Sequence, residues 1–324
     1  MRLTRLAERG VLGMNARNAL YVSRWNQRRN YPLVDDKLIT KRLAERAGIG
    51  VPPLYGVIPH QHEVKTLRSR LTGYADFVVK PAHGSGGNGI LVVGNRSRDR
   101  LVKASGQEIS FEDLEFHVSN IISGMYSLGG HPDVAMLEYR VVFDPLFEEV
   151  AYKGVPDIRT LVFRGVPVMA MVRLPTRASD GRANLHQGAV GAGIDLATGR
   201  TTSAVWRNRL VEAHPDTGKA IAGLEIPNWT KLLDLAARCH DLTGLGYLGV
   251  DIVLDAHYGP LMLELNARPG ISIQIANRAG LRHRLDHVEA WLASRANAPA
   301  VDDRVRFAKR SFAVGRTREG AHHA

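Results

Sequence analysis

Three polar residues that carry oxygen atoms stand within two apolar runs in the C-terminal half of the sequence. Asp251 lies in the run 249–255, and Glu264 and Asn266 lie in the run 261–266. Side chains alternate between the two faces of a β-strand, so Glu264 and Asn266 point the same way. If residues 255–260 form the loop of a hairpin, Asp251 falls directly opposite Glu264. A few hard oxygen donors suit Mg²⁺, which takes its other ligands from water and phosphates.

A plainer interpretation competes with a metal site. A half-buried hairpin whose polar face meets solvent has the same pattern, and three polar positions alone favour it. Residues elsewhere in the chain must therefore decide between the two.

Two lysines stand where a phosphate could bind. Lys37 falls in the first turn of a helix predicted for residues 35–48, which opens on acids and ends at Gly48. The helix macrodipole disfavours a cation in that turn, so Lys37 indicates either a nearby phosphate or an accident of the surface. Lys80 ends an apolar strand that begins near Asp76 and leads into a glycine-rich loop.

The loop after Lys80 contains Gly84, Gly86 and Gly89, which are spaced as G-x-G-x-x-G. The dinucleotide-binding form of this motif is followed by a helix, whereas a β-branched and apolar run follows here. No Gly-Lys-Ser or Gly-Lys-Thr closes the loop, and neither His-Arg-Asp nor Asp-Phe-Gly follows as in protein kinases. Strand, glycine loop and strand together predict a flap whose backbone N–H groups bind phosphates.

Helices and further hairpins fill the middle of the sequence. A serine cap with an acid three residues later predicts a helix that starts at Ser110. Residues 157–163 and 166–173 predict a hairpin. Arg159 and Arg173 would by default be ordinary surface charges of that hairpin.

Residues 174–193 form a long irregular segment that contains Arg182, Asn184 and His186. Long loops in compact domains are usually functional or disordered. His186 has no cysteine or histidine neighbour at zinc spacing, so we do not expect it to bind a metal. Residues 304–324 are expected to form a loose basic tail.

The composition is that of a folded protein. A length of 324 residues allows two or three subdomains, and 44% hydrophobic with 23% charged residues is ordinary. The single cysteine, Cys239, excludes an internal disulfide, which fits a reducing compartment. Neither a membrane-spanning apolar run nor a secretory signal is evident, so a cytoplasmic location is expected.

The charge balance calls for an anionic partner. The net charge is +11 and the pI is near 10.0. Residues 1–31 form a basic arm, in which seven arginines face the single acid Glu8. The loose helical spacing of its apolar residues favours a helix packed on the main domain. The alternatives are a nucleic-acid-binding arm, a helix at a membrane surface and an organellar presequence.

The sequence resembles the ATP-grasp superfamily, because it contains, in this order, Lys37, Lys80, the glycine flap and the trio Asp251, Glu264 and Asn266. The resemblance runs from about residue 32 to about residue 288 and is strongest to the branch with the ribosomal-protein glutamate ligase and α-L-glutamate ligase-like proteins. It implies an α+β ATP-grasp fold, in which two α+β subdomains with antiparallel sheets grip ATP after a short helical N-terminal arm. The implied parts are an arm at 1–31, an N-terminal subdomain with the flap at 32–137, a C-terminal subdomain with the magnesium site at 138–298 and a basic tail at 299–324.

The resemblance also implies roles for single residues. Lys37 and Lys80 match phosphate-side lysines, and the hinge whose backbone binds adenine matches Glu138 and Tyr139. The other nucleotide contacts expected are His83, Gly84, Ser85, Gly86 and Gly87 in the flap, together with Asp157, Arg182 and Asn184. The magnesium ligands match Asp251, Glu264 and Asn266. Because arginine forks suit phosphate and carboxylate, the residues expected to steady the transferred phosphoryl group are Arg159, Arg173 and Arg268.

Two departures from the family bear on the substrate. Only 36 residues precede Lys37, where family members usually carry a substantial α/β domain that helps to bind the acceptor. Arg268 stands where the glutamate ligases have a small residue. Substrate contacts are therefore expected to differ from those of the glutamate ligases.

The implied activity is ligation of a carboxylate to an amine through an acyl phosphate, with ATP and Mg²⁺, or Mn²⁺ in its place. The expected substrates are small molecules or peptides that carry these groups, with glutamate or a peptide favoured. The alternatives are an ATP-grasp kinase, a nucleotide-binding regulator without turnover and, as the least favoured, a polyanion-binding protein. A membrane surface or a protein is expected as a partner of the arm in preference to nucleic acid, and the sequence is compatible with an oligomer.

Overall fold

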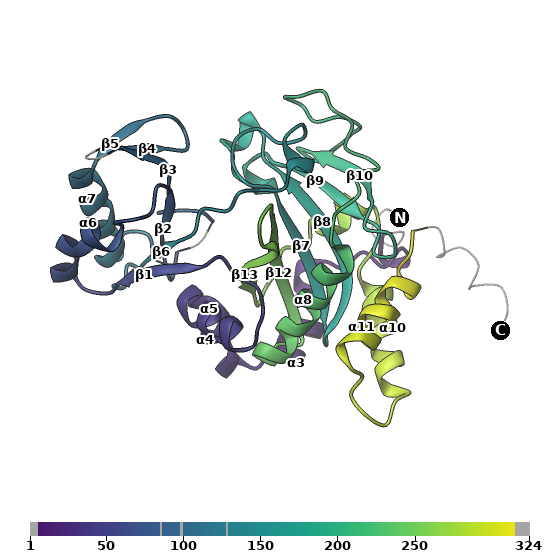
Figure 1. The fold of residues 1–324 in the computed structure, drawn as a ribbon. Helices are drawn as coiled ribbons and strands as arrows, with labels where there is room; N and C mark the ends of the chain where they lie inside the picture. The colour runs from purple at the N-terminus through teal and green to yellow at the C-terminus, as the bar shows by residue number, and fades with distance from the viewer. Residues whose placement is uncertain (1–5, 85, 98–99, 128, 315–324) are drawn as a thin grey trace. The chain divides into compact units, whose positions relative to one another are not determined.

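The computed structural model describes residues 6–84, 86–97, 100–127 and 129–314. The chain folds as α+β, with two antiparallel sheets in two compact units (Figure 1). Unit 1 comprises Met1–Val34, Leu43–Gly50 and Phe143–Ala324, and unit 2 comprises Asp35–Arg42 and Val51–Val142. The boundary passes through helix α5 (Lys37–Arg46), whose first residues belong to unit 2.

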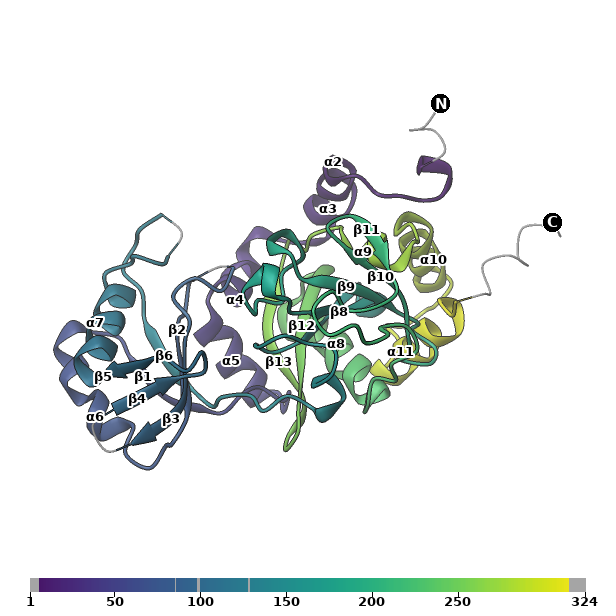
Figure 2. The same ribbon diagram turned by 90° about the horizontal axis from the view of Figure 1, so that it is seen from above.

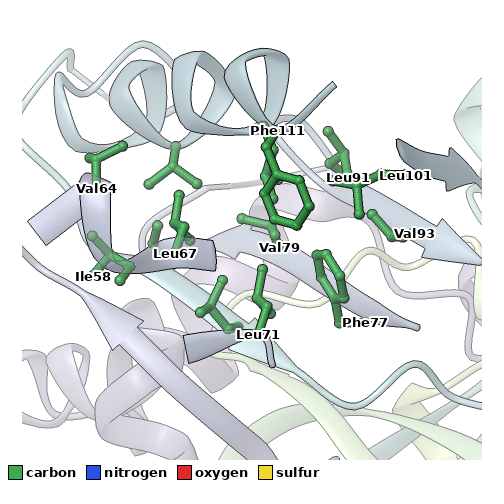
Figure 3. Close-up of a cluster of buried hydrophobic side chains, with 14 of the residues drawn as sticks. Ile58, Val64, Leu67, Leu71, Phe77, Val79, Leu91, Val93, Leu101 and Phe111 are labelled. Carbon is green, nitrogen blue, oxygen red and sulfur yellow. The ribbon is translucent and has the colours of Figure 1, made fainter. Parts of the chain in front are cut away.

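Unit 2 is built on a six-stranded sheet in the order β1-β6-β2-β3-β4-β5. Its strands are β1 Leu54–Ile58, β2 Phe77–Pro81, β3 Leu91–Ser97, β4 Arg100–Lys103, β5 Glu108–Ser110 and β6 Ala135–Glu138, and its further helices are η3 Gln61–Thr66, α6 Leu67–Arg70 and α7 Phe111–Ile122. The predicted serine cap is confirmed, because Ser110 and Asp113 form a capping box at the start of α7. Buried side chains such as Leu67, Val79 and Phe111 gather between the helices and the strands as the core of this unit (Figure 3).

Unit 1 is built on a seven-stranded sheet in the order β11-β10-β9-β8-β7-β12-β13. The strands are β7 Asp157–Phe163, β8 Val166–Leu174, β9 Val190–Ile194, β10 Thr201–Trp206, β11 Arg209–Val211, β12 Tyr247–Asp255 and β13 Gly259–Asn266. The helices after the arm are η4 Pro145–Phe147, η5 Arg177–Ser179, η6 Leu185–Gln187, α8 Trp229–Thr243, α9 Ile273–Asn277, α10 Arg282–Ala293 and α11 Val301–Ser311 (Figure 2). None of the described helices is long and apolar enough to cross a membrane.

The two faces of the unit 1 sheet differ in character. Ile158, Ile252 and Met262 follow one face, where the thiol of Cys239 in α8 lies 3.8 Å from the sulfur of Met262. α8 and α11 cover this apolar face (Figure 1). Arg159 and Asp251, which pair across neighbouring strands, lie on the opposite face. The sheet therefore leaves a charged face on the side away from α8.

The N-terminal arm packs on unit 1. It contains α2 Met14–Arg17, η1 Asn18–Val22, α3 Ser23–Trp25, η2 Arg28–Asn30 and α4 Pro32–Asp35. The Asn26 side-chain amide donates to the carbonyl oxygens of Tyr247 and Ala267 at 2.8 Å each and accepts from the Tyr247 N–H at 2.8 Å. The Tyr21 ring meets the Phe163 ring edge-on at 5.6 Å. Of the interpretations of the basic arm, the structure therefore contains the helical segment packed on the main domain.

Two sequence-based expectations fail in this unit. The segment 174–193 is not irregular to its end, because β9 starts at Val190 and pairs with β8 and β10. The tail is helical as far as Ser311, because Val305 and Phe307 are buried and Phe307 stacks on Trp291 at 4.1 Å. Ten further residues of the tail, 315–324, lie outside the described residues.

Candidate functional site

The hairpin of β12 and β13 brings the expected metal ligands to one face. Asp251 is the cross-strand partner of Glu264, which confirms the predicted register. The loop is shorter than predicted, since Asp255 pairs with Gly259, which shifts the register at the turn by one residue; a bulge at residue 263 restores the predicted pairing of Asp251 with Glu264. Asn266 lies two residues beyond Glu264 on β13 and therefore on the same face.

Asp251 is also the centre of a buried ion network. Arg159, its partner on β7, donates Nε–H and Nη2–H to the two oxygens of Asp251 at 2.7 and 2.6 Å. Arg173 on β8 donates Nη2–H to Asp251 at 2.8 Å and forms a bidentate pair with Asp157. The expectation that Arg159 and Arg173 are ordinary surface charges is wrong, because the central strands β7 and β8 bury these side chains against two aspartates.

The network fixes the charge states of its members. Burial alone would raise the pKa of Asp251, but the charges of Arg159 and Arg173 and their hydrogen bonds outweigh burial and hold that pKa below its ordinary value. Burial raises the pKa of Asp157 to about 6, against the opposing effect of Arg173. Burial would lower the pKa of each arginine, but the neighbouring aspartates raise both, so the guanidinium groups stay charged.

The donor set of the hairpin fits Mg²⁺ in type and number. Two carboxylates and one carboxamide supply oxygen ligands from one sheet face, and Mg²⁺ usually takes one or two protein carboxylates with water and phosphate oxygens. Among the described residues, no three His, Cys, Asp or Glu side chains gather closely enough to hold a metal by themselves. Asn266 and ligand oxygens would therefore complete the coordination shell around Asp251 and Glu264.

Unit 2 carries a second buried charge cluster, centred on Glu138 at the end of β6. The Lys80 ammonium lies 2.7 Å from Glu138 Oε2, and the Lys41 ammonium lies 3.1 Å from Oε1. Lys41, in α5, also donates to the carbonyl oxygen of Pro52. Sequence reasoning missed Lys41, although its place four residues after Lys37 on a helix puts both lysines on one face.

The glycine loop has the predicted order of strand, loop and strand. β2 pairs with β3 on either side of it, and Gly86 and Gly87 adopt positive φ of 64° and 80°. No described heavy atom lies within 4 Å of the place where a Cβ would stand at either glycine, so their backbone can be approached closely. The Lys37 ammonium donates to the carbonyl oxygen of Gly84 and thereby ties the helix start to this loop. Ser85 lies outside the described residues.

His83 is held in place just before these glycines. Its backbone N–H lies 3.1 and 3.2 Å from the two oxygens of Asp133, and its Nδ1 lies 2.7 Å from Oδ1. A carboxylate only accepts hydrogen bonds, so Nδ1 carries a proton and donates to Asp133. The Asp133 carboxylate, which sequence reasoning missed, is fully buried and fixes the orientation of the ring.

The remaining site residues lie in different surroundings. The backbone N–H of Tyr139 donates to the carbonyl oxygen of Pro53 at 2.9 Å, so it is already engaged within unit 2. Asn184 Oδ1 accepts from the His186 N–H at 3.0 Å and caps η6, while Arg182 is exposed. The guanidinium of Arg268 is exposed and lies 5.0 Å from the centre of the Tyr31 ring in the arm.

Thus the structure divides the predicted residues into two groups. The group in unit 1 that meets in direct contacts is Asp157, Arg159, Arg173 and Asp251, with Glu264 and Asn266 on the same hairpin face. The group in unit 2 that surrounds the glycine loop and Glu138 is Lys37, Lys80, His83, Gly84, Gly86 and Gly87.

Curated relatives are named as glutamate ligases. A probable α-L-glutamate ligase of Maridesulfovibrio salexigens is 25% identical over 236 residues, which cover 73% of this chain and 56% of that protein. One of Aeromonas salmonicida is 24% identical over 267 residues, with 82% and 67% covered. The ribosomal protein bS6–L-glutamate ligase of Salmonella paratyphi B is 27% identical, with 73% and 56% covered. The chain thus spans little more than half the length of the first and third of these relatives.

Two solved ligase structures are similar to this chain at low sequence identity. The ligase PsnB in complex with a minimal precursor gives a TM-score of 0.44 at 17% identity, with 84% of this chain and 64% of that chain covered. D-Alanine–D-alanine ligase from Bacillus anthracis, in complex with ATP, gives 0.43 at 14% identity, with 87% and 68% covered.

A family model decides the assignment. The model described as sugar-transfer associated ATP-grasp matches residues 16–290, which is most of the chain. The match includes both sheets, the glycine loop and the charged face of unit 1. The chain therefore belongs to the sugar-transfer associated ATP-grasp family.

Proposed function

We propose that this protein is an ATP-dependent carboxylate–amine ligase. The observation that carries the proposal is the row of charged side chains across β7, β12 and β13, in which Arg159, Asp251 and Glu264 are successive cross-strand partners. Cations beside metal-binding carboxylates suit the transfer of a phosphoryl group, where catalysis rests on positioning and on charge neutralisation.

The reaction proceeds in two steps. A carboxylate oxygen of the substrate takes the γ-phosphoryl group of ATP, and ADP leaves. The nitrogen of the amine then attacks the acyl carbon, inorganic phosphate leaves, and an amide forms with loss of a proton. No protein nucleophile is required, because each bond is made between the bound reactants.

Each charged group has a task in this scheme. Glu264 and Asn266, with Asp251, would hold Mg²⁺, which supplies charge neutralisation at the β- and γ-phosphates. Arg159 and Arg173 steady the transferred phosphoryl group, since guanidinium forks match its oxygens. Lys80 and Lys37 supply positive charge at the glycine loop, whose backbone N–H groups approach the phosphates.

The substrates belong to the amino acids, the peptides or related amines. Glutamate is a candidate because the curated relatives are named as glutamate ligases. The description of the family as sugar-transfer associated adds amino sugars to the candidates.

Mass spectrometry of the products tests the proposal. The full chain is incubated with ATP, Mg²⁺ and a pool of amino acids, short peptides and glucosamine. We expect an amide of defined mass, formed in step with ADP and phosphate, and no product when EDTA removes the metal. Glu264→Gln should abolish turnover, whereas Glu225→Gln should not change it, because Glu225 is an exposed carboxylate that pairs with exposed Arg200.

Two other outcomes of this experiment would indicate a function other than ligation. A phosphorylated product without an amide identifies a kinase. ATP binding without consumption over the whole pool identifies a regulator.

A further inference from the structure

The turn that follows β13 carries an exposed arginine close to a candidate metal ligand. β13 ends at Asn266, and Arg268 follows two residues later. Consecutive Cα atoms are about 3.8 Å apart, so the Cα atoms of these two residues lie within about 7.6 Å of each other. Arg268 therefore stands at the end of the hairpin that carries the candidate metal ligands.

This turn folds back over the charged face of the unit 1 sheet. Gly249 pairs with Asn266 and lies two residues before Asp251 on β12, so it belongs to the charged face. A Cβ at Gly249 would stand 2.6 Å from the Cβ of Pro269 and 3.5 Å from the Cβ of Asn266. Pro269 thus occupies the space over Gly249 on that face. Arg268, the residue before this proline, is therefore brought to the margin of the charged face.

Two buried side chains of the N-terminal arm hold the backbone of the turn. Arg17 donates Nη1–H to the carbonyl oxygen of Pro269 at 2.7 Å. The Asn26 side-chain amide donates to the carbonyl oxygen of Ala267 at 2.8 Å. The exposed fractions of Arg17 and Asn26 are 5% and 4%, so both donors are shielded from water. The arm thus fixes the backbone on either side of residue 268.

The burial of Arg17 is not explained by stability alone. Within the described parts of the chain, the Arg17 guanidinium has no carboxylate partner, and its Nε has no hydrogen-bond partner. A buried charge without a counter-charge costs free energy, and an apolar residue would pack the arm at a smaller cost. The hydrogen bond to the Pro269 carbonyl oxygen is the contact that an apolar residue could not make.

The arm also supports the side chain of Arg268. The Arg268 guanidinium lies 5.0 Å from the centre of the Tyr31 ring, a distance at which an aromatic ring attracts a cation. Arg268 is exposed and forms no ion pair or hydrogen bond through its side chain with the described residues. One planar face of the guanidinium is thus supported, while the N–H groups along its edge can bind an anion.

The charge balance of the sheet indicates which anion this is. In the ion network, Arg159 pairs with Asp251 and Arg173 pairs with Asp157, so two positive charges meet two negative ones. A substrate carboxylate must approach a triphosphate that is itself negative, and a nearby cation reduces the repulsion. Because Arg268 has no acidic partner among the described residues, its charge is the one that the substrate can use.

We propose that Arg268 binds the carboxylate substrate, and that Arg17, Asn26 and Tyr31 are its positioning residues. The guanidinium donates two hydrogen bonds to the carboxylate, and a remaining lone pair of one oxygen attacks the γ-phosphorus of ATP. The new bond joins that oxygen to phosphorus, and the bond from phosphorus to the departing ADP oxygen breaks. The assignment rests on the proposed ligase function and names the residue that binds its acid.

Labelling of the full chain with phenylglyoxal, an arginine reagent, tests binding at Arg268 without turnover. Mass spectrometry of peptides follows each arginine, with Mg²⁺ and a non-hydrolysable ATP analogue present. We expect a pool of amino acids and short peptides to slow labelling of Arg268 roughly threefold or more, because a bound carboxylate covers the guanidinium. The same pool with every carboxyl group converted to an amide should have no effect. Arg295, exposed and 4.4 Å from the centre of the Trp291 ring, is the matched internal control.

Three results of the labelling would overturn the proposal. The first is equal labelling of Arg268 with and without the pool. The second is equal protection of Arg268 and Arg295. The third is protection of Arg268 by the nucleotide analogue alone, which would assign this arginine to the phosphates.

Steady-state kinetics with the carboxylate found in the product test the same residue during turnover. Arg268→Gln should raise the KM for the carboxylate about 10- to 100-fold, the range for hydrogen bonds to a charged group, and leave the KM for ATP unchanged. Arg295→Gln should leave both KM values unchanged. An equal rise of both KM values in Arg268→Gln contradicts a role specific to the carboxylate.

Paired variants of the arm separate positioning from packing. Arg17→Met keeps the apolar bulk but loses the donor to Pro269, and should raise the KM for the carboxylate about threefold to tenfold. Arg17→Lys keeps a donor and should restore most of the parent value. Tyr31→Leu should raise the same KM, whereas Tyr31→Phe keeps the ring and should not. The positioning role fails if the KM for ATP rises equally, or if neither conservative variant restores the parent value.

The two proposals fail separately. If the pool protects Arg268 but ATP yields no amide, the binding of carboxylates at Arg268 stands and the ligase function fails. If an amide forms but Arg268 is not protected and Arg268→Gln leaves the KM for the carboxylate unchanged, the ligase function stands and the assignment of Arg268 fails.

Discussion

Replacement of Asp251 by asparagine removes the charge that holds two buried arginines. Asp251 accepts three charge-assisted hydrogen bonds, two from Arg159 and one from Arg173. Loss of one partner of a buried ion pair costs about 3–5 kcal/mol. Arg173 keeps its bidentate pair with Asp157, so we expect the lower end, about 3 kcal/mol. In a unit of this size that loss lowers the unfolding midpoint by roughly 6–12 °C.

Differential scanning calorimetry and urea unfolding measure this change. Glu264→Gln is the comparison variant, because Glu264 is another candidate metal ligand but is only partly buried, whereas Asp251 is fully buried. We expect both variants to lose turnover and only Asp251→Asn to lose stability. A loss below about 0.5 kcal/mol in Asp251→Asn, within the range usual for surface substitutions, would refute the view that this carboxylate holds the arginines.

Three more predictions follow from buried polar groups elsewhere. Glu138→Gln removes the buried carboxylate that pairs with the ammonium groups of Lys41 and Lys80, so urea unfolding should show a loss of about 3 kcal/mol; an unchanged midpoint contradicts the cluster. Asn26→Ala removes three hydrogen bonds to Tyr247 and Ala267 and should cost about 2–4 kcal/mol in thermal unfolding, while exposed Gln27→Ala should cost almost nothing; equal effects would count against anchoring by Asn26. Burial lowers the pKa of His214, whose Nε2–H donates to Pro175 and whose Nδ1 accepts from the Asp216 N–H. Because the unfolded state binds the proton at a higher pH than the folded state, neutral His214 contributes fully to stability above the ordinary pKa of 6.5, and this contribution is lost as the pH falls below that value. The decrease in unfolding free energy between pH 7.5 and pH 5.5 should therefore be smaller in His214→Gln than in the parent.

Local patterns were sufficient to predict the hairpin that carries Asp251 and Glu264. Alternation of side chains sets which residues share a face, and the turn residues set the approximate register. The bulge at residue 263 was not predictable, because the partner strand decides where an extra residue is accommodated. The bulge offsets the one-residue difference in register at the turn, so Asp251 lies opposite Glu264 as predicted.

The ion network around Asp251 could not be predicted from the sequence, for a different reason. Arg159 and Asp251 are 92 positions apart and meet only because β12 inserts between β7 and β13. A strand read alone does not reveal whether it is central or at an edge, so a charge on it looks like a solvated one. Lys41 was missed in the same way, since its partner Glu138 lies on β6, far along the chain.

The strand β9 was not predicted from the sequence, because its composition is unusual for a strand. Residues 190–194 read Val-Gly-Ala-Gly-Ile, which lacks the bulky β-branched run of a typical strand. A Cβ at Gly191 would stand 2.7 Å from Leu185, and one at Gly193 would stand 2.7 Å from the Ala276 carbonyl oxygen. η6 and α9 can therefore approach β9 only because glycines occupy these positions. The two glycines of this strand are thus explained by the close packing of η6 and α9, because neither residue is required for a turn.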